Sequence, residues 1–213
     1  MMFSFILAKP QPDCGQLSGE EAENIGKSKK EPDSTGDHYE DFPEDQGKDL
    51  KGAEIVKIAT DLKDYGNKAF KADDLNLALS KYQKGLRYLN EYPEALPEDD
   101  PELAKELTHV RFTLHSNSAL LQIKLKSFED AQSSADNALE LEELPNQDRA
   151  KASYRKALAL LGLKDEEEAV KALETAQELA PGDAAINKEL GAAKKKAEEH
   201  AKKEKAAYKK FFE

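Results

Sequence analysis

A lysine and an asparagine lie four residues apart in the segment LKDYGNKAF, at Lys63 and Asn67. On an α-helix this spacing stacks two side chains on one face, so an ammonium group and an amide would point in the same direction. Such a pair can hold an anion, above all a carboxylate. Alone it means little, because lysine and asparagine are ordinary on a solvated helix. The pair predicts a binding site only if the rest of the chain supplies further donors beside it.

The composition limits the classes of protein to which the chain can belong. Of its 213 residues 35% are charged and 7% aromatic, and the net charge is −11. This acidic balance argues against a nucleic-acid-binding protein, which needs excess Lys and Arg against phosphate. The single cysteine, Cys14, excludes an intrachain disulfide framework and fits a reducing compartment.

The longest apolar run, residues 1–8, lacks a basic flank and is far shorter than the roughly 20 residues of a membrane helix. A secretory signal is the less favoured alternative. We therefore predict no membrane segment and a cytoplasmic location.

The first 52 residues offer little to a folded core. Residues 1–18 hold a short apolar piece with no partner strand later in the chain, so they are either disordered or the trailing edge of another domain. Residues 19–50 carry eleven acidic residues against four lysines, interleaved with Gly, Ser and Pro. This composition predicts a disordered acidic linker over residues 19–52.

From about residue 53 the apolar residues follow a helical period. One register recurs three times, at Ala78, Ala131 and Ala169. Small residues precede these alanines by twelve positions and follow them by seven: Gly66, Ala119, Ala157, Gly85, Ala138 and Ala176. Small residues at these offsets let paired helices approach closely. The pattern resembles the thirty-four-residue helix–turn–helix of the tetratricopeptide repeat, at residues 59–92, 112–145 and 150–183.

This resemblance implies an all-α solenoid of three tetratricopeptide repeats within residues 53–183, since three repeats are about the minimum that stacks into a continuous core. An insert around residues 93–111, whose part at 102–111 is helical, separates the first two repeats, and we expect it to lengthen the adjoining helices. The pattern of residues 184–213 predicts one more amphipathic helix, which would cap the apolar edge of the last repeat. Calmodulin or an acidic partner also binds basic amphipathic helices, so this second interpretation stays open.

In such a solenoid the first helix of every repeat lines the concave face. The register places five donors on these first helices: Lys63 and Asn67 in repeat one, Asn117 in repeat two, and Lys151 and Arg155 in repeat three. Three of the five are cationic, so they would form a basic cradle within an acidic surface. Such a contrast focuses the approach of a carboxylate ligand, and a guanidinium can bind a carboxylate through two parallel hydrogen bonds.

These residues, in the segments LKDYGNKAF, HSNSALL and KASYRKA, resemble the dicarboxylate clamp of chaperone-binding tetratricopeptide domains. The resemblance implies binding of the C-terminal Glu-Glu-Val-Asp tail of the ninety-kilodalton heat-shock chaperone, or of the seventy-kilodalton one. It also implies that Phe70 lines a pocket for an apolar ligand side chain, although a core position between helices explains Phe70 equally well. The function implied is that of a co-chaperone adaptor in protein folding.

The order of segments resembles that of the forty-kilodalton cyclophilins, two-domain peptidyl-prolyl isomerases that act as co-chaperones. Residues 13–17, DCGQL, are similar to the end of their last barrel strand; an acidic linker, three clamp repeats and the tail KEKAAYKKFF follow. The resemblance makes residues 1–18 the remnant of a cyclophilin domain. The residues before Asp13 do not match the family's eight-stranded barrel, so we expect no isomerase activity from this chain.

The residues themselves indicate no catalytic centre. The four histidines are scattered, with no metal-ligand spacing, and the chain has no phosphate-cradling glycine loop and no nucleophile elbow. We therefore predict a binding module that uses neither cofactor nor metal. The alternatives are a prolyl isomerase, which is the activity of the family it resembles, and a scaffold that binds through its convex face or its tail.

Overall fold

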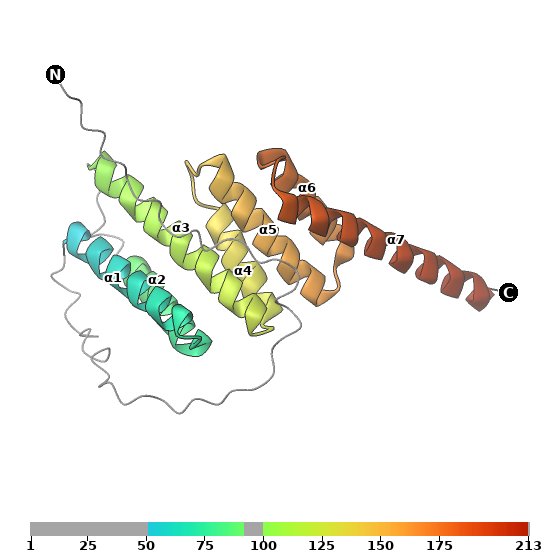
Figure 1. Ribbon diagram of the computed structural model, residues 1–213, viewed down its shortest axis with the longest axis horizontal. Helices are drawn as coiled ribbons and strands as arrows, with labels where there is room; N and C mark the ends of the chain where they lie inside the picture. The colour runs from blue at the N-terminus through green and yellow to red at the C-terminus, as the bar shows by residue number, and fades with distance from the viewer. Residues whose placement is uncertain (1–50, 92–99, 213) are drawn as a thin grey trace, which may run out of the picture. The chain divides into compact units, whose positions relative to one another are not determined.

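The computed structural model describes residues 51–91 and 100–212, and within them it contains α-helices and no strand. In chain order the helices are α1 (Gly52–Lys71), α2 (Leu75–Glu91), α3 (Pro101–Lys124), α4 (Phe128–Leu139), α5 (Asn146–Leu163), α6 (Glu166–Leu179) and α7 (Ala184–Phe212). Successive helices pack against one another along the chain (Figure 1). The all-α fold is confirmed. The predictions for residues 1–18 and for the linker up to residue 50 lie outside the described residues.

The helices form three hairpins, α1–α2, α3–α4 and α5–α6, whose turns share one backbone geometry. Asp73, Lys126 and Lys164 each adopt a left-handed conformation, with φ of 63°, 63° and 66°. Each of these residues lies five positions before the register alanine of its repeat. A residue with a side chain loses roughly 1–2 kcal/mol in this conformation, which packing of the two helices must offset. The sequence repeat is therefore also a repeat of backbone structure.

Aspartates cap the starts of several helices. The side chain of Asp100 accepts hydrogen bonds of 3.1 Å from two backbone N–H groups in the first turn of α3, whose first residue is Pro101. Asp165 and Asp183 cap α6 and α7 in the same manner. Because α3 begins at Pro101, it includes the predicted helical insert. Leu103 and Leu107 of this extension pack against the core of the first repeat, which explains why the helix is longer than its counterparts.

The register positions form the core between paired helices. Ala78, Ala131 and Ala169 are all 0% exposed, as small residues at a close helix contact should be. The ring of Tyr82 explains why the first repeat has a glycine at position 66. A Cβ atom on Gly66 would lie 2.3 Å from Cε1 of Tyr82. The small residues thus serve helix packing, as the sequence pattern predicts.

Helix α7 packs on the last repeat through its first half. Ile186, Leu190 and Ala193 are buried in the cluster formed with α5 and α6, and Lys194 Nζ lies 2.9 Å from the carboxylate of Glu174. Beyond this point the side chains described on α7 are mostly exposed. The predicted capping helix is confirmed. None of the helices in the described part of the chain contains an apolar stretch that could span a lipid bilayer.

Candidate ligand-binding site on the first helices

The first helices of the three repeats, α1, α3 and α5, lie side by side. Helix α3 contacts both α1 and α5, as Figure 1 also shows. We call the surface that these three helices share the first-helix face. All six predicted site residues belong to these helices: Lys63, Asn67 and Phe70 on α1, Asn117 on α3, and Lys151 and Arg155 on α5.

Asn67 and Asn117 join the first two repeats across this face. The Nδ2 atom of Asn117 donates to Oδ1 of Asn67 over 3.5 Å, at the long end of the hydrogen-bond range. The same Oδ1 atom accepts a shorter hydrogen bond, 2.7 Å, from the hydroxyl of Tyr82 on α2. Two amides from different repeats therefore meet at one point, and both are partly buried.

Arg155 links the second repeat to the third. Its guanidinium donates to the hydroxyl of Ser116, the residue next to Asn117 on α3, and only 4% of the arginine is exposed. Ser116 itself is 1% exposed. A cation held this deep keeps few alternative positions and is poorly screened by salt, so it would interact strongly with a ligand anion that reaches it.

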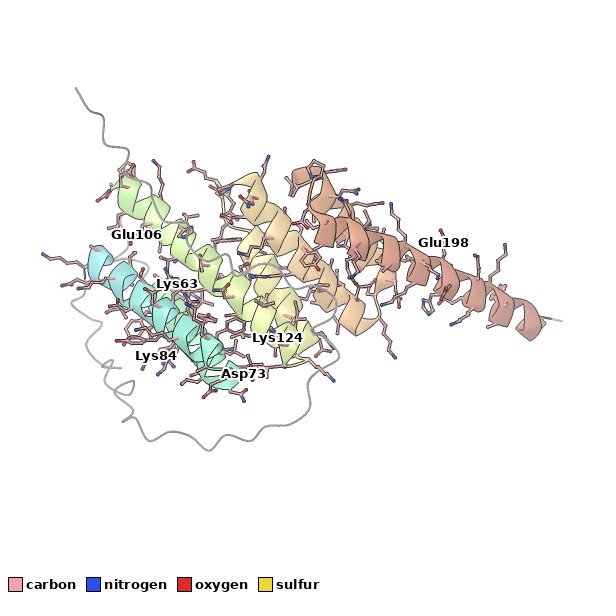
Figure 2. All side chains as sticks on the ribbon, viewed as in Figure 1. Lys63, Asp73, Lys84, Glu106, Lys124 and Glu198 are labelled. Carbon is pink, nitrogen blue, oxygen red and sulfur yellow. The ribbon has the colours of Figure 1, made fainter. Side chains whose placement is uncertain are left out.

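The two lysines lie one helical turn from these residues. Lys63 precedes Asn67 on α1, and its Nζ atom is 3.6 Å from the carboxylate of the exposed Asp64. Lys151 precedes Arg155 on α5 and is partly buried. Figure 2 shows where Lys63 lies on α1. The predicted residues therefore fall in two layers, with the lysines one turn before the amide and guanidinium groups.

Phe70 has two structural roles. It is partly buried and packs against the hydrophobic core of the first repeat. The ammonium group of Lys124, at the end of α3, also lies 5.7 Å from the centre of its ring, within the range of a cation–π contact. The structure therefore accounts for Phe70 without a ligand, and its place in a ligand pocket stays a prediction.

An ionisable pair lies on α3 near Asn117. Burial and the charge of Arg111 lower the pKa of His115 to about 4, so this histidine is neutral at pH 7. Burial also lowers the pKa of Arg111, whose guanidinium donates to the backbone oxygen of Leu89 over 2.9 Å. At neutral pH the positive charge on this part of the face comes from lysine and arginine, with none from His115.

The repeat pattern does not reveal the residues that hold the predicted donors in place. Tyr82 and Ser116 contact Asn67 and Arg155 directly, and Asp64 pairs with Lys63. Tyr82 lies four residues after Ala78, and the residues at the same offset in the other repeats, Ala135 and Leu173, are buried core residues. Nothing in the repeat pattern indicates that the hydroxyl of Tyr82 reaches an amide. In the described part of the chain, no three His, Cys, Asp or Glu side chains are placed to hold a metal ion.

Solved structures agree with the repeat architecture. The C-terminal tetratricopeptide-containing domain of a putative FK506-binding protein of Plasmodium falciparum matches with a TM-score of 0.64 and 27% identity, over 72% of this chain and 97% of that one. The chain carries a tetratricopeptide-repeat domain. The first such domain of Spaghetti (RPAP3), solved with the HSP90 peptide SRMEEVD, matches with a TM-score of 0.51 and 27% identity, over 66% of this chain and 93% of that one.

Curated relatives give the domain a wider context. Peptidyl-prolyl cis-trans isomerase D of Mycosarcoma maydis is 35% identical over 218 residues, which is 94% of this chain and 54% of the relative. The protein of the same name from Cryptococcus neoformans is 40% identical over 184 residues, 83% of this chain and 49% of the relative. The chain thus spans about half the length of these isomerases, and the predicted resemblance to them is confirmed. No family model matches the chain.

Proposed function

We propose that the chain is a co-chaperone adaptor module that binds the acidic C-terminal Glu-Glu-Val-Asp peptide of the 90-kDa heat-shock chaperone in the cytoplasm. The binding residues are Lys63, Asn67, Asn117, Lys151 and Arg155. The observation that carries the proposal is the continuous set of contacts across the three first helices. Asn67 meets Asn117, and Ser116 beside Asn117 meets Arg155.

The chemistry of these groups suits a ligand with two carboxylates. Lysine, arginine and the Nδ2 atoms of asparagine are hydrogen-bond donors, and hydrogen bonds from charged donors to carboxylates are about twice as strong as neutral ones. A terminal aspartate supplies its side-chain and α-carboxylates only a few bonds apart. The related RPAP3 domain was solved with a peptide that ends in Glu-Val-Asp, which supports this class of ligand.

Calorimetry with acetyl-Met-Glu-Glu-Val-Asp tests the proposal. We expect binding that weakens as ionic strength rises, since charged groups carry the interaction. Lys151→Ala removes one charge-assisted contact and should weaken binding about tenfold or more. Lys171→Ala is the matched control, because Lys171 is exposed on α6, paired with Glu168, and outside the first-helix face.

Two results of this titration would contradict the proposal. A peptide with an amidated C-terminus that binds as tightly as the acid, or a Lys151→Ala variant that binds as tightly as Lys171→Ala, would show that no carboxylate is gripped. The same titration with the tail of the 70-kDa chaperone measures the preference between the two chaperones, which share the final four residues.

The second candidate function is that of a peptidyl-prolyl cis-trans isomerase, the activity named for the relatives of which this chain spans about half. In the described residues the helices are those of the tetratricopeptide domain. We propose that this chain supplies binding and does not itself isomerise proline. Turnover of a proline peptide by the chain in a coupled assay would overturn that part of the proposal.

A further inference from the structure

The side-chain amide of Asn67 is held from its oxygen side. Its Oδ1 atom accepts from the hydroxyl of Tyr82 at 2.7 Å and from Nδ2 of Asn117 at 3.5 Å. A carbonyl oxygen has two lone pairs, so these two donors occupy its acceptor positions. The Nδ2 group of Asn67, with its two N–H donors, is therefore directed away from both partners.

The opposite orientation of this amide is unfavourable. Rotation by 180° would place Nδ2 of Asn67 against Nδ2 of Asn117, with two donors facing each other and no acceptor between them. The rotated amide would also lose the short hydrogen bond that Tyr82 donates, and would keep a contact there only by donating its own Nδ2 to the hydroxyl oxygen. The orientation described satisfies Oδ1 of Asn67 from two sides, whereas the rotated one opposes two donors, so Tyr82 and Asn117 together favour the orientation described.

The hydroxyl of Tyr82 cannot easily leave this place. The side chain is 2% exposed, and its ring packs so closely on Gly66 that a Cβ atom there would lie 2.3 Å from Cε1 and 2.6 Å from Cδ1. Gly66 is adjacent to Asn67 on α1. The close contact that the glycine permits therefore brings a hydroxyl from α2 to the amide on the next residue.

We propose that Tyr82 is a positioning residue that orients the amide of Asn67 as a donor and so makes the first-helix face select a carboxylate over a carboxamide. This inference rests on the proposed function. A freely turning asparagine can donate to a carboxylate or accept from an amide N–H, whereas an asparagine whose Oδ1 atom is occupied by Tyr82 and Asn117 presents its Nδ2 donors. The orientation therefore adds discrimination against a ligand whose terminal oxygen is replaced by NH2.

The test compares Tyr82→Phe with Tyr88→Phe, a second buried tyrosine on the same helix. Each protein is titrated with acetyl-Met-Glu-Glu-Val-Asp and with the same peptide amidated at its C-terminus. We expect Tyr82→Phe to bind the acid about three- to tenfold more weakly, the usual effect of one hydrogen bond, and to lose less affinity for the amide. The ratio of the two affinities should thus fall in Tyr82→Phe and stay at the wild-type value in Tyr88→Phe.

A purely structural role for Tyr82 would weaken both peptides equally, so an unchanged ratio overturns the inference even if affinity drops. Wild-type protein that binds neither peptide would overturn the proposed function and the selectivity together. A double-mutant cycle on the unfolding of the free protein reports the hydrogen bond separately. Tyr82→Phe should raise the unfolding equilibrium constant about fivefold in the wild-type background and much less in Asn67→Ala; equal effects in both backgrounds would contradict the contact on which the inference depends.

Discussion

Two glycine-to-alanine substitutions should change the stability of this protein in opposite directions. Both Gly66 and Gly191 lie inside helices, where alanine is favoured over glycine by about 1 kcal/mol. At Gly191 a Cβ atom would meet nothing within 4 Å. Gly191→Ala should therefore stabilise the protein by about 0.5–1 kcal/mol.

At Gly66 the packing outweighs this helical preference. The new Cβ atom would lie 2.3 Å from Cε1 of Tyr82 and 3.1 Å from its Cζ, so the ring or a helix must move by about 1 Å to restore normal contact. Overpacking of this kind typically costs 1–3 kcal/mol, and the displaced ring would also weaken its hydrogen bond to Asn67. We expect Gly66→Ala to destabilise the protein by about 1–2 kcal/mol.

Urea unfolding followed by circular dichroism measures both effects. The two variants should differ by about 1.5–3 kcal/mol, which in a thermal unfolding experiment on a domain of this size corresponds to roughly 3–12 °C in midpoint temperature. Gly66→Ala that stabilises the protein as much as Gly191→Ala does would refute the packing of α1 on α2 described above. It would also remove the reason that the hydroxyl of Tyr82 meets Asn67.

Three further perturbations test other parts of the structure. His115 has a pKa of about 4 in the folded protein and about 6.5 in the unfolded chain. The free energy of unfolding should therefore fall by up to about 3 kcal/mol as the pH is lowered from 6.5 to 4, because the unfolded chain binds the proton first. In His115→Gln, the difference between the free energies of unfolding at pH 7 and at pH 4.5 should be smaller than in the wild type by this amount. The same difference in both proteins would contradict the prediction. Asp64→Asn removes the carboxylate that competes for the ammonium group of Lys63, so calorimetry should show acidic-peptide binding that is about twofold to fivefold tighter. Weaker binding would show that Asp64 itself helps to bind the peptide. Leu190→Ala should destabilise the protein by about 2–4 kcal/mol in urea, because Leu190 is 4% exposed between α7 and the last repeat; no loss would show that α7 does not cap it.

The repeat architecture could be predicted because one physical constraint recurs at fixed spacing. Wherever two helices of a hairpin approach closely, the side chain must be small, and Ala78, Ala131 and Ala169 mark these contacts in each repeat. The donors were predictable for a related reason: once the register is known, it assigns Lys63 and Asn67 to a first helix. What they bind, and whether they bind together, stays a prediction.

The supporting contacts could not be predicted from the same pattern. Phenylalanine would fill the space of Tyr82 equally well, so the repeat gives no sign that a hydroxyl is needed there. The burial of Arg155 was also unexpected, since arginine in a helix is usually solvated, and it depends on Ser116 in a different repeat. The first contact depends on how closely α1 and α2 pack within one hairpin, and the second on how two hairpins stack. Neither geometry can be read from the spacing of small residues along the chain.

One calorimetric comparison shows whether the first-helix face binds two carboxylates through Lys63, Asn67, Asn117, Lys151 and Arg155. The chain is titrated with acetyl-Met-Glu-Glu-Val-Asp as the free acid and as the C-terminal amide, at low and at physiological salt. We predict that the acid binds about tenfold or more tightly than the amide and that this advantage shrinks as salt is added. Equal affinity for the two peptides would show that these residues do not bind the terminal carboxylate.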